Sequence, residues 1–252
     1  MKKDENENLT HFGFQSVNTA EKKIKVAEVF NSVAKRYDLM NDLMSFGLHR
    51  IWKKIAIDYC QILPNQQILD IAGGSGDLSF YLSSKINEKG KIILADINES
   101  MLTIAKNRFL DAGLLNKISL VQADAENLPF PTNYFDRIII SFGLRNVTHK
   151  EKALNSFYQT LKPGGKLLIL EFSKTETPFI KQGYDFYSFN LLPFLGRVVT
   201  GDSKSYQYLA ESIRMHPSQE ELKQMLLVAG FDEVKYINLL SGIVAIHIGL
   251  KF

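Results

Sequence analysis

Short apolar runs alternate with helical stretches through the middle of the chain. After Pro64 the runs are rich in Ile, Leu and Val, and Gly, Asp, Asn or Pro bound each of them. They are Gln67–Ile71, Lys91–Ala95, Ile118–Val121, Arg137–Ser141 and Lys166–Leu170. Continuous apolar runs joined by helices are typical of strands buried on both faces of a mainly parallel sheet. The pattern therefore predicts a Rossmann-like, doubly wound α/β core over residues 64–174.

Helical periodicity precedes this core. Between residues 21 and 62 apolar side chains recur every three or four positions, which predicts an N-terminal cap of helices. Residues 1–20 are polar and show no period, so we expect them to form a frayed, flexible leader. Residues 21–252 are then expected to form a single domain.

Two further segments follow the core. Residues 175–216 carry many aromatic side chains, and this helical insert is either a substrate lid or a helical pair packed on the core. In residues 217–252, Ser218 and Glu221 predict a capping box at the start of a helix that ends at Gly230. A mixed sheet of seven strands is completed by two closing strands, at residues 233–239 and 242–250.

The composition narrows the functional classes only a little. The chain has 252 residues, of which 45% are hydrophobic, and a net charge of +3, too weak a field to indicate nucleic-acid binding. Cys60 is the one cysteine, so an internal disulfide is excluded and a reducing compartment fits. No apolar run approaches the ~20 residues of a membrane-spanning helix, and the first residues lack the apolar core of a secretory signal. We therefore expect a protein that is neither exported nor membrane-spanning.

The most informative stretch is a glycine turn between a strand and a helix, ILDIAGGSGD at residues 68–77. Glycine lets the backbone approach a ligand closely and adopt a positive φ without steric cost. Twenty positions after Gly76, Asp96 ends the next strand, where a carboxylate can accept both hydroxyls of a ribose. The sequence therefore predicts a nucleoside-binding site formed by Gly73, Gly74, Ser75, Gly76 and Asp96.

The residues around this turn favour S-adenosylmethionine (SAM) over a nicotinamide cofactor. The dinucleotide fingerprint needs Gly or Ala three residues after its second glycine, but Ser79 follows Gly76. Asp70 would repel a pyrophosphate and attract the cationic groups of SAM. Asp124 and Ala125 follow the third strand, where methyltransferases of this class place an acceptor for the adenine amino group. We add to the predicted cofactor site Asp124, Ala125 and, at the end of the fourth strand, Ser141.

From about residue 25 to residue 252 the chain resembles the ubiquinone/menaquinone biosynthesis C-methyltransferases. YDLMNDLMSFGLHRIW at residues 37–52 fits the first signature of that family without a departure, and KPGGKLLILEFS at 162–173 fits the second. Further matching blocks are LADINESML, ISFGLRNV and YLAESIRMHP. The departures are small: Ser75 stands where Thr is usual, Asp124 where Asn is common, and Gln159-Thr160 where Arg-Val begins the second signature.

This resemblance implies a class I SAM-dependent methyltransferase that methylates a ring carbon of a polyprenylated hydroquinone. The implied reaction converts demethylmenaquinol to menaquinol, or methylates 2-methoxy-6-polyprenyl-1,4-benzoquinol on the way to ubiquinone. The acceptor must be the reduced ring, because an oxidised quinone is electrophilic and cannot attack a methyl sulfonium. Such a transfer needs no metal ion, and none is expected.

The loop after the fourth strand, Gly143-Leu144-Arg145-Asn146, is where the acceptor is expected to lie. We hypothesise that Arg145 stabilises the developing phenolate, and that Asn146 and Tyr37 position the ring hydroxyl or a bridging water. The alternative is that Arg145 is a surface residue paired with an acid. His49 and His149 are further candidate bases, and the sequence favours neither.

A polyprenyl tail is insoluble in water, so the substrate is expected to enter from a bilayer surface through an apolar mouth. The predicted mouth is residues 179–199, with Lys181 and Arg197 beside aromatic side chains. This predicts a cytoplasmic protein that contacts the inner face of the membrane peripherally and transiently. The sequence leaves open whether the chain forms a homodimer or binds other proteins of quinone biosynthesis.

Three other functions are weaker alternatives. A methyltransferase for another lipid or small molecule would share the SAM half of the fold, but the stretch at residues 37–52 argues against it. A nucleic-acid methyltransferase is disfavoured because no N-P-P-Y or D-P-P-Y element follows the fourth strand and no strong basic face is evident. A SAM-binding regulator without activity could have lost Arg145 and Asn146, and both are present.

Overall fold

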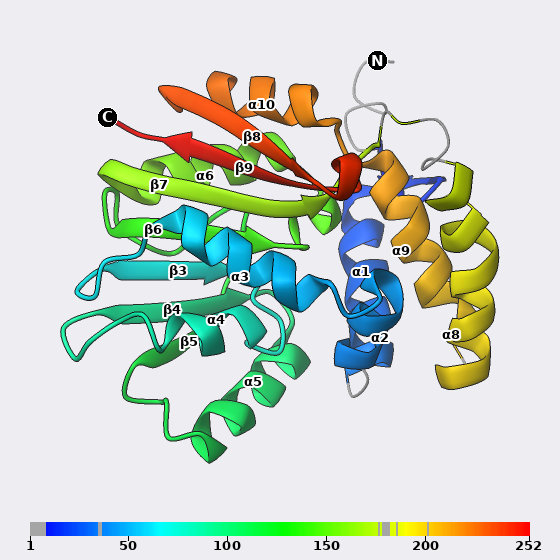
Figure 1. The fold of residues 1–252 in the computed structure, drawn as a ribbon, viewed down its shortest axis with the longest axis horizontal. Coiled ribbons are helices and arrows are strands. Elements are labelled where there is room, and N and C mark those ends of the chain that lie inside the picture. The colour runs from blue at the N-terminus through cyan, green and yellow to red at the C-terminus, as the bar shows by residue number, and fades with distance from the viewer. Residues whose placement is uncertain (1–8, 35–36, 176, 178–181, 185, 201) are drawn as a thin grey trace.

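A computed structural model describes residues 9–34, 37–175, 177, 182–184, 186–200 and 202–252 of the chain. These residues form a seven-stranded sheet in the order β5-β4-β3-β6-β7-β9-β8 (Figure 1). β3 to β7 pair in parallel, whereas β9 runs antiparallel to both β7 and β8. The strands are β3 (Gln67–Ile71), β4 (Lys91–Asp96), β5 (Ile118–Gln122), β6 (Phe135–Ser141), β7 (Leu161–Phe172), β8 (Glu233–Leu239) and β9 (Val244–Leu250).

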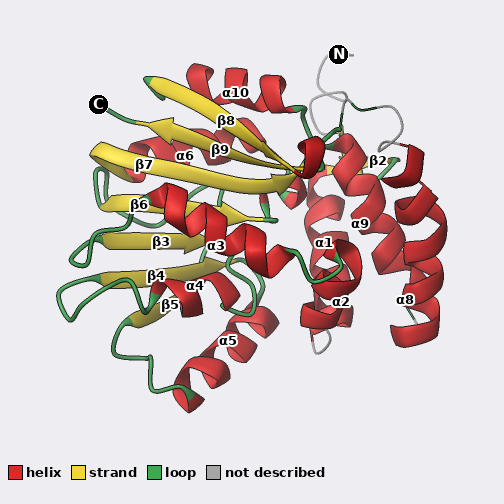
Figure 2. Cartoon of the chain, viewed as in Figure 1, coloured by secondary structure: helices red, strands yellow, loops and turns green. Residues whose placement is uncertain are grey.

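Helices cover both faces of this sheet (Figure 2). Successive side chains of a strand point to opposite faces, so Ile68 of β3 packs into one apolar cluster and Leu69 into the other. The first cluster includes side chains of α3 (His49–Cys60), α4 (Asp77–Leu82) and α5 (Glu99–Asp111). The second includes side chains of α6 (Lys150–Thr160) and α10 (Gln219–Val228). The predicted doubly wound, mixed seven-stranded architecture is therefore confirmed.

The predicted strands of the core and the C-terminal segment agree with the structure to within two residues, except that β7 begins at Leu161, five residues before the predicted start at Lys166, and ends at Phe172. The capping box of α10 is present, because Ser218 N donates to Glu221 Oε2 at 2.7 Å and the Ser218 side chain accepts from Glu221 N. Gly230 follows this helix with φ +104°, a left-handed conformation that glycine adopts without strain.

Residues 9–20 differ from the prediction of a frayed leader. β1 (Leu9–Phe12) and β2 (Gln15–Asn18) pair as an antiparallel hairpin, and α1 (Thr19–Val33) begins directly after it. Phe12 stacks on Tyr208, with ring centroids 4.1 Å apart. Gly13 turns the hairpin with φ +57°, and a Cβ there would lie 2.1 Å from Glu211 Oε2. The hairpin packs against α9, a helix far along the chain, so the contacts that stabilise it could not be predicted from its own short sequence.

Most of the expected helices of the cap and the insert stand at the edge where the parallel strands end, whereas α3 lies across one face of the sheet (Figure 1). In the cap they are α1, α2 (Tyr37–Ser45) and α3; in the insert a π-helical turn at Tyr187–Leu191 leads into α8 (Leu192–Thr200) and α9 (Ser203–Met215). Within the described ranges, none of the helices combines the length and the apolar character needed to cross a bilayer.

Candidate functional site

The turn after β3 and the loop after β6 meet at the carboxyl edge of the sheet. Ala72 and Phe142, the first residues after these strands, have φ values of +53° and +56°. Residues other than glycine rarely adopt this region, and such strain clusters at functional sites. A Cβ on Gly143 would lie 2.6 Å from the Cβ of Ala72. Only glycine therefore fits where the two segments touch.

The glycine turn is tight on its inner side as well. Gly76 N donates to Gly73 O at 3.0 Å, and α4 begins at the next residue. A Cβ on Gly73 would lie 2.8 Å from Leu94 Cγ, and one on Gly76 would lie 2.3 Å from the Phe109 ring. Gly76 also has φ +84°. A side chain there would both clash with the Phe109 ring and require a backbone conformation that other residues rarely adopt.

Asp96 lies at the end of β4 and is tied to this turn. Its Oδ2 accepts from Gly74 N at 2.9 Å, and its Oδ1 accepts from Asn98 N at 2.8 Å. Burial raises the pKa of the Asp96 carboxyl above its usual value, and the backbone N–H groups of Asn98 and Gly74 oppose that rise. Each carboxylate oxygen has a second lone pair, so both can still accept from a pair of ribose hydroxyls.

Buried oxygen atoms without hydrogen-bond partners lie at and around the turn. Asp70 Oδ2 accepts from Ser79 Oγ at 2.6 Å, but Asp70 Oδ1 is buried without a partner, as are Ser75 Oγ and Ser141 Oγ. Burial raises the pKa of Asp70 to about 7. Buried polar atoms are usually satisfied, so orphaned ones call for an explanation. These atoms suit a ligand that brings an ammonium and hydroxyl groups, and the residues therefore fit SAM.

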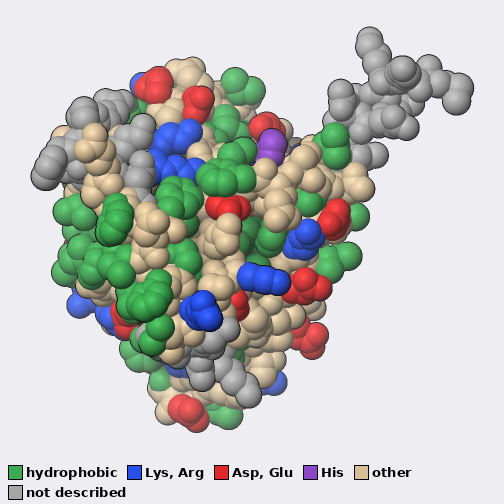
Figure 3. Space-filling model, turned by 90° about the vertical axis from the view of Figure 1, so that its right-hand side faces the viewer, with side chains coloured by type: hydrophobic (Ala, Val, Ile, Leu, Met, Phe, Trp, Pro, Cys, Tyr) green, Lys and Arg blue, Asp and Glu red, His purple; other side chains and the backbone are tan. Residues whose placement is uncertain are grey.

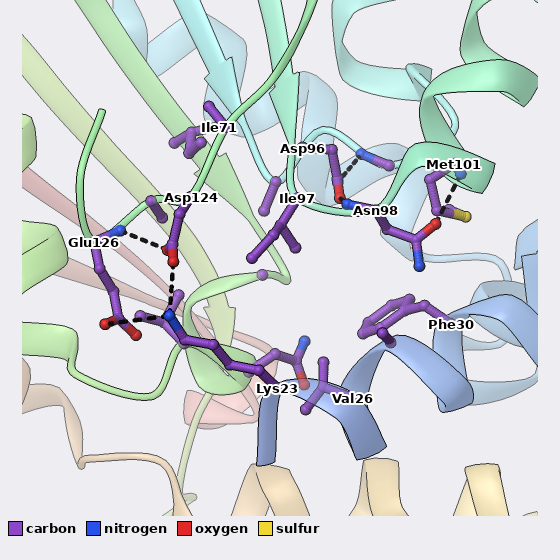
Figure 4. A pocket seen from close by; sticks show the side chains of 18 of the residues that line it. Lys23, Val26, Phe30, Ile71, Asp96, Ile97, Asn98, Met101, Asp124 and Glu126 are labelled. Atoms are coloured by element: carbon purple, nitrogen blue, oxygen red, sulfur yellow. Dashed lines mark hydrogen bonds and ion pairs between the residues drawn. The ribbon is translucent and has the colours of Figure 1, made fainter. Parts of the chain in front are cut away.

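A pocket beside the turn brings together five of the residues predicted from the sequence: Gly74, Asp96, Asp124, Ala125 and Asn146. Figure 4 shows two of them, Asp96 and Asp124, at the pocket. The remaining predicted cofactor residues lie in the turn or at the end of β6 without lining the pocket: Gly73, Ser75, Gly76 and Ser141. Ile97, half exposed, adds an apolar wall that suits a planar base.

The N-terminal helix supplies a pocket wall that sequence reasoning missed. Lys23 and Phe30 of α1 line the pocket, and Lys23 Nζ donates to Asp124 Oδ2 at 2.8 Å (Figure 4). This hydrogen bond raises the pKa of Lys23. No local motif marks these α1 residues. Asn98 was also missed, although its position before a helix was a readable signal: its Oδ1 caps α5 by accepting from Met101 N.

The predicted catalytic residues have different surroundings. Asn146 lines the pocket. The side chain of Arg145 is 3% exposed and does not line it; Nη1 donates to Glu171 Oε1 at 2.7 Å and to Phe142 O at 2.6 Å. Tyr37 begins α2, and its side chain lies outside the described residues. The structure thus gives Arg145 an acidic partner, as the alternative expected, but the ion pair is buried and does not lie at the surface.

Neither candidate histidine lines the pocket. His49 is buried at the start of α3, with Nε2 3.0 Å from Asp42 Oδ1, and burial lowers its pKa. His149 precedes α6, and its backbone N donates to Glu126 Oε1 at 3.0 Å. Neither histidine ring therefore lies where it could act as the base of a reaction in this pocket.

Solved structures share this fold. A SAM-dependent methyltransferase from Aquifex aeolicus superposes with a TM-score of 0.62 and 20% sequence identity, covering 86% of this chain and 96% of its own. At that identity the likeness concerns the fold alone. The sheet order and the flanking helices are those of the class I SAM methyltransferase fold.

The Arg145–Glu171 pair predicts a stability effect. Arg145→Met leaves the carboxylate of Glu171, itself 2% exposed, buried and unpaired, so we expect the free energy of unfolding to fall by about 3–5 kcal/mol. Adding Glu171→Gln removes the charge but keeps an acceptor for the backbone, and the double variant should regain much of that loss. Urea unfolding of the single and double variants measures both effects. Unchanged stability of Arg145→Met would contradict a stabilising role for the pair.

The bonds of Asp96 predict an effect on cofactor affinity. Asp96→Asn removes the charge and replaces one acceptor with a donor that faces backbone N–H, so we expect SAM to bind about 10- to 100-fold more weakly. Isothermal titration calorimetry gives the dissociation constant. Asp111→Asn, at the exposed end of α5, is the matched control and should bind SAM as the parent does. Unaltered affinity of Asp96→Asn would remove Asp96 from the cofactor site.

The family is settled by comparisons across the whole sequence. Residues 17–251 match the model of the ubiE/COQ5 methyltransferase family. A protein of Yersinia enterocolitica and one of Photorhabdus laumondii, both named ubiquinone/menaquinone biosynthesis C-methyltransferase UbiE, are each 57% identical over 249 residues, covering 99% of this chain and 99% of theirs. The glycine turn, the strand-end acids and the sheet order agree with that match. This chain belongs to the ubiE/COQ5 methyltransferase family.

Proposed function

We propose that this protein transfers the methyl group of SAM to a ring carbon of a polyprenylated hydroquinone. The acceptor is demethylmenaquinol, or the methoxy-polyprenyl-benzoquinol of ubiquinone synthesis. The observation that carries the proposal is a single pocket lined by Gly74 and Asp96 on the nucleoside side and by Asn146 on the side of the acceptor loop. The names of the relatives from Yersinia and Photorhabdus support the choice of acceptor.

The chemistry requires the ring carbon, the methyl group and the sulfur to lie in line. SAM supplies a methyl group activated by its sulfonium charge. Because Gly143 touches Ala72, the acceptor loop and the cofactor turn share one rigid contact. That contact fixes the distance between the two substrates. We infer that Asn146 holds the ring oxygen, on which negative charge grows as its proton passes to a bridging water.

Arg145 holds the loop that carries Asn146. Glu171 Oε2 accepts from Arg145 N at 3.2 Å, while the guanidinium bonds Glu171 Oε1 and Phe142 O. The loop over residues 142–146 is thereby fastened to β7. With its charge paired, Arg145 would stabilise a phenolate only from a distance, and its main contribution is to position Asn146.

We assign to the cap and the insert a peripheral contact with the cytoplasmic face of the membrane, through which the prenyl tail enters. Phe46, Phe186, Phe194 and Val198 each expose 60% or more of their surface. Hydrophobic side chains gather on this side of the molecule, with basic residues near them (Figure 3). Exposed apolar patches of this kind mark interaction sites. Of the predicted mouth, Phe179 and Lys181 lie outside the described residues.

Anaerobic methylation tests the reaction. Purified protein is incubated with methyl-labelled SAM and chemically reduced demethylmenaquinol, and the lipid product is analysed by mass spectrometry. We expect a ring-methylated menaquinol that is absent when the reductant is omitted, because only the reduced ring is nucleophilic. The methoxy-polyprenyl-benzoquinol is tested in parallel. SAM binding without methylation of either quinol would refute the acceptor assignment.

Liposome flotation tests the membrane contact. The protein should float with vesicles that contain anionic lipids, and Phe194→Ser combined with Val198→Ser should reduce the floated fraction severalfold, because both changes remove exposed apolar surface. Leu110→Ser on α5, where the parent residue is also well exposed, is the matched control and should float like the parent. No flotation of the parent, even when loaded with quinol, would contradict the contact.

A further inference from the structure

One hydrogen bond joins the aromatic insert to the acceptor loop. The hydroxyl of Tyr208, on α9, donates to Asn146 Oδ1 at 3.0 Å. Tyr208 is 4% exposed and is the first residue of the YLAESIRMHP block. No residue of this block lines the cofactor pocket. Asn146 lines the pocket, so the state of this one amide affects what the pocket offers to an acceptor.

An asparagine amide has two chemically different ends. Its oxygen accepts, whereas its NH₂ group donates two hydrogen bonds. Burial raises the pKa of Tyr208 above its usual value, so the phenol keeps a proton that it can donate. In the structure it donates that proton to the amide oxygen of Asn146. The NH₂ group is then the end that is left for the acceptor.

We propose that Tyr208 is a positioning residue that orients the amide of Asn146, so that its NH₂ group donates to the oxygen of the bound hydroquinone. This proposal rests on the function proposed above. A donor stabilises that oxygen as it becomes negative, whereas a flipped amide would present an acceptor and repel it. The orientation is set before the substrate arrives, which lowers the cost of organising the site.

The N-terminal hairpin holds Tyr208 in place. The ring of Phe12 stacks on that of Tyr208, with centroids 4.1 Å apart and planes 13° apart. The next turn of α9 is bound as well, because Phe14 N donates to Glu211 Oε2 at 3.0 Å. The hairpin therefore clamps the helix that carries the hydroxyl, and a segment remote from the pocket contributes to its chemistry.

The deciding variant is Tyr208→Phe, which keeps the stacked ring and removes only the hydroxyl. We expect kcat for quinol methylation to fall about tenfold, the effect of one well-placed hydrogen bond, while the dissociation constant of SAM stays unchanged. Asn146→Ala should lower kcat further. In that background Tyr208→Phe should have no additional effect, because the two residues act through one contact. Tyr236→Phe on β8, whose ring lies beside His247, is the control and should turn over like the parent.

A second variant tests the clamp without touching the hydroxyl. Phe12→Leu should lower kcat about two- to fivefold, because it weakens the stacking that holds Tyr208. The inference is overturned if Tyr208→Phe retains the parent's kcat, or if it lowers kcat equally in the Asn146→Ala background. A parent protein that methylates neither quinol contradicts the proposed function, whereas an active parent with an unaffected Tyr208→Phe contradicts this inference alone.

Discussion

The site depends on the parallel pairing of β3 with both of its neighbours. Ile71, the last residue of β3, lies opposite Ala95 of β4 and Ile140 of β6. Since parallel strands end at the same edge of a sheet, the residues that follow them meet there although they are far apart in sequence. The glycine turn, Asp96 and the acceptor loop are neighbours for this reason. A shift in register would separate them and also move the strand side chains to the wrong face.

Strained backbone conformations and an unsatisfied buried oxygen, which lower the stability of a fold, lie together at this edge of the sheet. Ala72 and Phe142 adopt left-handed backbone conformations, and Asp70 has a buried carboxylate oxygen without a partner. The two apolar clusters on either side of the sheet supply the rigidity that keeps these residues in place. Arg145 and Glu171 extend this support to the loop, where a buried ion pair ties the chain after β6 to the end of β7.

The sequence predicted the features that depend on local patterns. The strands, the glycine turn, Asp96 and the capping box at Ser218 each follow from residues within a few positions of one another. What depended on distant partners was missed. The hairpin at residues 9–18 is stabilised by α9, and Lys23 enters the site only because α1 packs beside Asp124. Arg145 lies in the predicted loop, and an acidic partner was expected as an alternative. The sequence did not show that this partner is Glu171, which lies 26 positions away on the next strand.

The most direct measurement of this arrangement is a crystal structure of the protein with S-adenosylhomocysteine, the product that remains after methyl transfer. The predicted result has both ribose hydroxyls within hydrogen-bond distance of the Asp96 carboxylate, the base against Ile97, and the amino group of the base near Asp124. The sulfur should then face Asn146 across the pocket. A nucleoside bound away from Asp96, or a sulfur turned away from the acceptor loop, would contradict it.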